Sequence, residues 1–149
     1  MEKLTWPGVR GVFALAVLSL VLLTPACNGH DSPTERSQSD VVTIDGIVPA
    51  ITTVLRRGTQ VTISVTAGYT LSSASEGRLA LVLQDQDNHV IGPLPQPEAR
   101  VVRGQGSVTL SSTLTVPASA TMVRVFVPLT PQGATSTSTL ATASYTVTP

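Results

Sequence analysis

The side chains with the greatest capacity for chemistry lie together at positions 85–89, where the sequence reads Asp-Gln-Asp-Asn-His. In an extended chain alternate side chains point to the same side, so Asp85, Asp87 and His89 would present two carboxylates and an imidazole together. Calcium favours such a density of oxygen ligands. An EF-hand loop does not fit, because Val90 stands where that loop needs glycine and Gln96 where it needs glutamate.

The same five residues also predict a hairpin turn. Apolar residues precede them at 79–83 and follow at 90–91. Asp and Asn side chains hydrogen-bond their own backbone and tolerate left-handed geometry, as a turn requires. Of the two interpretations we favour the turn, and we predict no bound metal or other cofactor. Asp85, Asp87 and His89 remain the metal-site candidates.

Residues for hydrolytic catalysis are sparse. A serine triad needs a histidine base, and the two histidines are His30, in a polar segment, and His89, beside the predicted turn. No serine stands in a G-x-S-x-G motif, and Gly104-x-Gly106 lacks the lysine and the helical pattern of a phosphate loop. We therefore expect the protein not to be an enzyme.

One aromatic side chain is a candidate for ligand binding. Sugar rings stack on exposed aromatics, and Phe126 falls on the polar face of an alternating segment beside Arg124. The alternative is an edge residue that a neighbouring loop covers.

The first 26 residues have the order of a secretory signal peptide. Lys3 and Arg10 precede the apolar residues 11–23, and Thr-Pro-Ala-Cys follows at 24–27. A helix over residues 11–23 would be about 20 Å long, short of the roughly 30 Å of bilayer hydrocarbon. The segment therefore predicts an exported protein whose signal helix, residues 1–26, is removed.

Residues 22–27, Leu-Leu-Thr-Pro-Ala-Cys, resemble the cleavage box of bacterial lipoproteins, although Thr24 stands where that family usually has leucine. The resemblance implies that Cys27 is acylated, with palmitate among its lipids, and anchors the protein in a membrane. Asn28, in place of aspartate, then fits the outer membrane or cell surface better than the inner membrane. The alternative is ordinary cleavage after Ala26, which leaves Cys27 as a terminal thiol.

Residues 27–40 predict a flexible linker, because positions 28–40 carry no apolar residue except one proline. From Val41 the hydrophobic period becomes two, which predicts one all-β domain over residues 41–149. The inward positions include Tyr145, and Ser112 is the one polar residue that interrupts their apolar pattern. Ser72, Ser73 and Ser75 predict a polar loop. Strands are expected at 41–48, 60–67, 79–83, 107–116, 121–129 and 143–147, with turns at 57–58, 76–77, 87–88, 92–93, 104–106, 117–118 and 131–133.

About seven short strands at this spacing resemble an immunoglobulin-like or fibronectin-III-like antiparallel β-sandwich. The cysteine pair and core tryptophan of antibody domains are missing from residues 41–149. The resemblance implies a fold and is silent about activity.

These features predict a non-catalytic structural or protein-interaction module at the cell envelope, whose partner is another envelope or surface protein. Arg56, Arg57, Arg100 and Arg103 flank expected strands, where they could discourage edge pairing or make contacts. The alternative is an accessory domain that binds calcium or carbohydrate at the cell surface. The formal net charge of +0 disfavours nucleic-acid binding.

Overall fold

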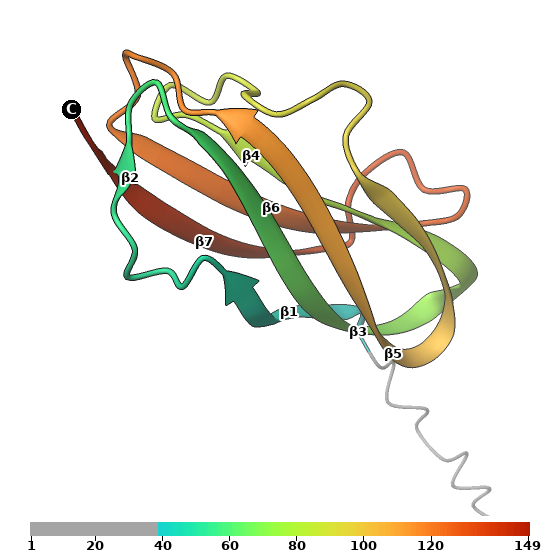
Figure 1. Cartoon of the computed structure of the whole chain (residues 1–149). Coiled ribbons are helices and arrows are strands. Elements are labelled where there is room, and N and C mark those ends of the chain that lie inside the picture. The colour runs from blue at the N-terminus through green and yellow to red at the C-terminus, as the bar shows by residue number, and fades with distance from the viewer. Residues whose placement is uncertain (1–38) are drawn as a thin grey trace, which may run out of the picture. The chain divides into compact units, whose positions relative to one another are not determined.

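The computed structural model describes residues 39–149, which form seven strands and no helix (Figure 1). The fold is therefore all-β, as predicted. Within this range no helix is long and apolar enough to cross a membrane. The expected signal peptide, Cys27 and nearly all of the expected linker lie outside the described residues.

The strands join in one hydrogen-bonded sheet with the order β1-β3-β6-β7-β2, while β4 pairs with β6 and β5 pairs with β3. Their bounds are β1 Val41–Val48, β2 Leu55–Arg56, β3 Gln60–Ala80, β4 Val82–Gln84, β5 Glu98–Thr115, β6 Met122–Pro131 and β7 Thr139–Thr148.

Two long strands carry the sheet from one layer of the fold to the other. The first half of β3 pairs with β1 and with the second half of β5, whereas its second half pairs with the first half of β5 and with β6. The register between β3 and β5 shifts between Leu71 and Glu76. Figure 1 shows β3 and β5 bending together, side by side, with β6 and β7 behind them.

The core lies between these layers and consists of aliphatic side chains at alternate positions. The inward residues predicted from the sequence are buried along β3 and β6, except Val61, which is half-buried, and Tyr145 of β7 is fully buried. The Tyr145 hydroxyl donates a hydrogen bond of 2.6 Å to the Pro49 carbonyl, which joins the end of β1 to the last strand. The fully buried set comprises Ile63, Val65, Ala67, Leu71, Leu79, Leu81, Leu83, Val116, Ala120, Val123, Val125, Val127, Leu129 and Tyr145.

Two predicted turns are wrong. Positions 76–77 lie inside β3 and positions 104–106 inside β5. Glycine serves close packing there: a Cβ on Gly77 would lie 3.0 Å from the Thr130 carbonyl oxygen, and one on Gly106 would lie 2.6 Å from the Tyr69 hydroxyl. Gly104 adopts a φ of 111° at the bend. Glycine inside a strand often marks such a bend or close approach.

The predicted polar loop at Ser72, Ser73 and Ser75 is also wrong, because all three lie in β3. The Asp40 carboxylate accepts hydrogen bonds from the backbone N–H groups of Ser72 and Ser73 at 2.8 and 3.0 Å, and from both hydroxyls. Burial opposes ionisation of Asp40, but these hydrogen bonds outweigh it and hold its pKa well below the usual range. Asp40 thereby fixes the start of the domain to the irregular part of β3.

The strands are not all antiparallel. Leu55–Arg56 forms a short strand that the alternating pattern did not predict, and it runs parallel to the end of β7. The chain leaves β1 in one layer and meets β7 in the other, in the same direction as β7. The other pairings are antiparallel, as expected.

Candidate functional site

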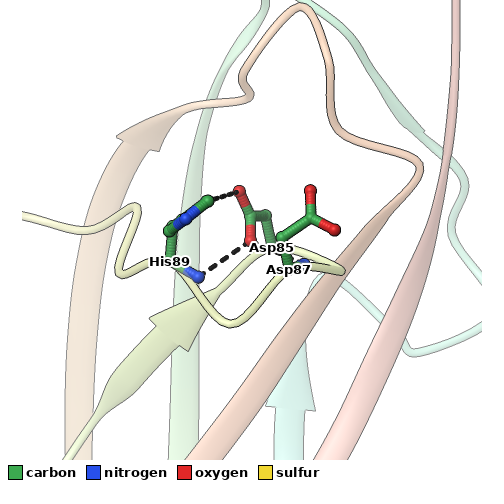
Figure 2. A group of neighbouring side chains, drawn as sticks. All are labelled: Asp85, Asp87 and His89. Atoms are coloured by element: carbon green, nitrogen blue, oxygen red, sulfur yellow. Dashed lines mark hydrogen bonds and ion pairs between the residues drawn. The ribbon is translucent and has the colours of Figure 1, made fainter.

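The segment 85–89 forms a tight turn after β4. The Asp85 N–H donates to the His89 carbonyl at 3.0 Å, and Asn88 adopts a φ of 67°, which asparagine tolerates. One carboxylate oxygen of Asp85 accepts the backbone N–H groups of Asp87 and His89, each at 2.9 Å. Its other oxygen lies 3.3 Å from Nδ1 of His89 (Figure 2). Both oxygens of Asp85 therefore hold the turn together.

The environment of Asp85 favours its charged form. Burial disfavours ionisation, yet the hydrogen bonds from the His89 and Asp87 backbones and the nearby His89 ring outweigh it and lower the pKa of Asp85. Asp85 is only 6% exposed, while Asp87 and His89 are exposed. The carboxylate is thus a structural acceptor inside the turn.

The three metal-site candidates do come together, since a ligand atom from each lies within 4.8 Å of the others. However, Asp87 accepts a hydrogen bond from the Gln86 side chain at 2.8 Å, and its carboxylate lies on the far side of Asp85 from His89 (Figure 2). Calcium takes six to eight oxygen ligands, more than this group supplies. The arrangement fits the predicted turn better than a calcium centre.

Phe126 and Arg124 lie on the outward face of β6. Phe126 is half-buried and stands between Val82 of β4 and Thr142 of β7, so it belongs to a central strand and not to an edge. Arg124 donates to the Asn88 side chain at 2.7 Å and so joins β6 to the turn. The alternating pattern gave no sign of this contact.

A groove that the sequence analysis missed lies over the second half of β3. Its volume is about 450 Å³, and residues 130–134 form one wall. Arg78 and Glu98 are 3.6 Å apart, and Arg100 is paired with Glu76. The signal was a Glu-x-Arg pattern that occurs at 76–78 and again at 98–100, on strands that pair. The two ion pairs balance the charge of the groove.

The second half of β5, residues 104–115, forms a surface that we term the open edge. These residues pair with β3 on one side, and no described residue hydrogen-bonds to their backbone on the other. The sequence carries no charged residue between Arg103 and Arg124. The open edge therefore presents unpaired backbone groups without a charge to repel an incoming strand.

Hydroxyl side chains cover the outward face beside the open edge. Thr62 and Thr113 are paired at 2.8 Å, Ser64 and Ser111 at 2.8 Å, and Thr66 and Thr109 at 3.1 Å. Each pair joins β3 to β5 and uses one donor and one acceptor, which leaves further hydrogen-bonding capacity in every hydroxyl.

The four arginines named from the sequence occupy different places. Arg56 lies in β2, and Arg57 donates to the Ala120 carbonyl at 2.9 Å. Arg100 and Arg103 lie in the first half of β5, where Arg103 donates to the Ala74 carbonyl at 3.2 Å. None lies in the open edge.

The fold and these surfaces define an all-β protein with a sandwich-like arrangement of strands. Among solved structures the chain is similar to a glycosyl hydrolase family 2 member from Bacteroides cellulosilyticus, with a TM-score of 0.50 and 12% sequence identity. The likeness covers 70% of this chain but only 14% of that chain, so it concerns the fold alone. No protein-family model matches the sequence, and no curated protein matches it in sequence.

Proposed function

We propose that the protein is a non-catalytic module, anchored in the cell envelope through a lipid on Cys27, that works by binding protein at the open edge. The observation that carries this proposal is the uncharged, unpaired second half of β5. Strand addition at such an edge lets main-chain hydrogen bonds supply the affinity.

Two other exposed edges, β1 and the first half of β5, contain features that oppose strand addition. β1 carries Asp45 and a register shift between Ile44 and Gly46, and Pro49 follows its end. The first half of β5 carries Glu98, Arg100 and Arg103. Charges, bulges and prolines at an edge discourage pairing, so residues 104–115 are more open to an added strand than β1 or the first half of β5. Residues 139–146 of β7 are likewise uncharged and pair with β6 alone, and the open edge is the longer of these two edges.

The polar groups that sequence reasoning connected with chemistry have structural partners. Asp85 binds its own turn and Arg124 binds Asn88. These hydrogen bonds support a binding role for the protein over a catalytic one, because each side chain already stabilises the fold.

Two measurements on the full chain test the proposal. Cys27→Ser should abolish labelling by radioactive palmitate and release the protein from the membrane fraction, because a serine cannot carry the thioether-linked lipid. A photo-crosslinking residue at Thr113 should form a protein adduct in intact cells, whereas one at the exposed Thr146 of β7 should not. Retention of Cys27→Ser in the membrane fraction would refute the anchor, and equal labelling from both positions would refute the edge.

The groove favours a second function, binding of an uncharged, hydroxyl-rich ligand such as a sugar. Guanidinium groups donate to hydroxyls and carboxylates accept from them, and the groove offers both without net charge. Glucose, galactose and maltose are suitable probes. Binding should shift the Nε–H resonances of Arg78 and Arg100 in the wild type, and unchanged resonances at tens of millimolar sugar would exclude this alternative.

A further inference from the structure

The open edge has features that suit one partner above others. It offers no charged side chain. A shallow pocket of about 290 Å³ includes Gln105 and Gly106 at the beginning of the edge, but neither this pocket nor the groove over β3 is lined by residues 107–115. Strand-adding domains usually gain specificity from pockets that select the side chains of the added strand. The backbone and the outward side chains of the edge must therefore determine which partner binds.

We propose that this partner is a second copy of the chain, which pairs antiparallel with the open edge about a twofold axis near Ser111. The inference rests on the proposed function and names the protein bound there. The two three-stranded layers of β1, β3 and β5 would then become one continuous layer of the dimer. An isologous contact of this kind closes on itself, and the outer strands of the shared layer are then the two copies of β1, whose Asp45 and register shift oppose further pairing.

The outward side chains of the open edge are self-complementary in that register. With Ser111 on the axis, Thr109 lies opposite Thr113 of the second copy, and Ser107 lies opposite Thr115 of the second copy. Each outward residue from Ser107 to Thr115 thus meets another hydroxyl, whereas Gln105 falls opposite Pro117, beyond the end of β5. The pairs already present between β3 and β5, at 2.8 to 3.1 Å, demonstrate that such hydroxyls bond well at the spacing of neighbouring strands.

Charge and length also fit a second copy. Because residues 104–123 are uncharged, two edges approach without repulsion. Arg100 and Arg103 precede the segment and fall beyond the paired region in this register. With Ser111 on the axis the two strands overlap over residues 107–115, which at about 3.4 Å per residue span about 30 Å, long enough for a continuous ladder.

The neighbouring loop leaves the backbone of the edge unpaired. Gly92 approaches β5 from the core side, where a Cβ on this residue would lie 3.4 Å from the Ser112 hydroxyl oxygen. Within the part of the chain that the structure describes, no backbone hydrogen bond joins residues 86–97 to residues 104–115.

The first test uses paired double variants of the full chain in detergent, analysed by sedimentation velocity. Thr109→Lys with Thr113→Lys places like charges across the proposed contact and should weaken dimerisation at least about tenfold. Thr62→Lys with Thr66→Lys is the matched control: it breaks the same two hydroxyl pairs and adds the same charge, but one strand inward. Equal weakening by both variants, or a monomeric wild type, would overturn self-pairing.

The second test is crosslinking in membranes. Ser111→Cys should give a homodimer on mild oxidation, identified with two differently tagged copies, while Ser64→Cys, directly opposite on β3, should not. If Thr113 instead photo-crosslinks to another protein while the chain stays monomeric, self-pairing fails and the proposed function stands. If Thr113 forms no adduct at all and the wild type is monomeric, both fail.

Discussion

Ser112→Ala should stabilise the protein, although it removes a polar group from a sandwich that contains many hydrogen-bonded hydroxyls. Ser112 points inward from β5 and is 3% exposed. Its hydroxyl oxygen is buried and has no hydrogen-bond partner among the described residues. Burying an unpaired hydroxyl costs about 1–3 kcal/mol.

The expected gain is smaller than that cost, because alanine also gives up the dispersion contacts of the oxygen, each worth about 0.1–0.2 kcal/mol. We expect a net increase in the free energy of unfolding of about 1 kcal/mol. For a domain of about 110 residues the entropy of unfolding is near 0.23 kcal/mol per kelvin, so the melting temperature should rise by about 4 °C.

Ser111→Ala is the matched control, one residue away on the opposite face. Its hydroxyl is exposed and paired with Ser64 at 2.8 Å, so its loss should lower stability by about 0.5 kcal/mol or leave it unchanged. Thermal melts followed by far-ultraviolet circular dichroism, with urea unfolding at constant m-value, measure both changes. If Ser112→Ala melts below the wild type, the buried hydroxyl has a partner and the reasoning is wrong.

Three further predictions concern other polar contacts. Asp40→Asn should lower stability at pH 7 by about 1–2 kcal/mol at this partly exposed site. Because the folded-state pKa of Asp40 lies below its ordinary value of 3.8, its contribution is complete above that value and is lost as the pH falls below it, so melts of the two proteins should converge in acid. Tyr145→Phe should cost about 1 kcal/mol, seen as a melting temperature about 4 °C lower, through loss of the hydrogen bond to Pro49. Titration calorimetry with calcium or zinc should give no binding heat, and Asp85→Ala should melt earlier without metal; heat that vanishes in Asp85→Ala would contradict the assignment of Asp85 to the turn.

Much of the fold could be predicted because burial in a sheet has a period of two. The bounds of β1 were predicted as 41–48 and observed as Val41–Val48, and the inward positions of β6 are all buried. Alternation cannot reveal a two-residue strand such as Leu55–Arg56, because so short a segment has no period. The pairing of that strand depends on β7, which is remote in sequence.

The candidate site was predicted in part. Local spacing was enough to bring Asp85, Asp87 and His89 together and to suggest their turn. The contact of Arg124 with Asn88 and the groove at Glu76 depend on the register between strands far apart in the chain. No local pattern contains that register, although the repeated Glu-x-Arg was a usable signal.

The glycines that predicted turns also explain why an open edge exists. Gly106 lies at the bend of β5, and it has no Cβ to collide with Tyr69. Because of this, β5 follows β3 from one layer into the other without ending. A turn at 104–106 would have divided β5 into short strands. Instead β5 stays beside β3 along its 18 residues, and its opposite side meets no strand among the described residues. Glu98, Arg100 and Arg103 lie before the bend, and their charges oppose strand pairing there. Within β5 it is therefore the uncharged part after the bend that favours an added strand.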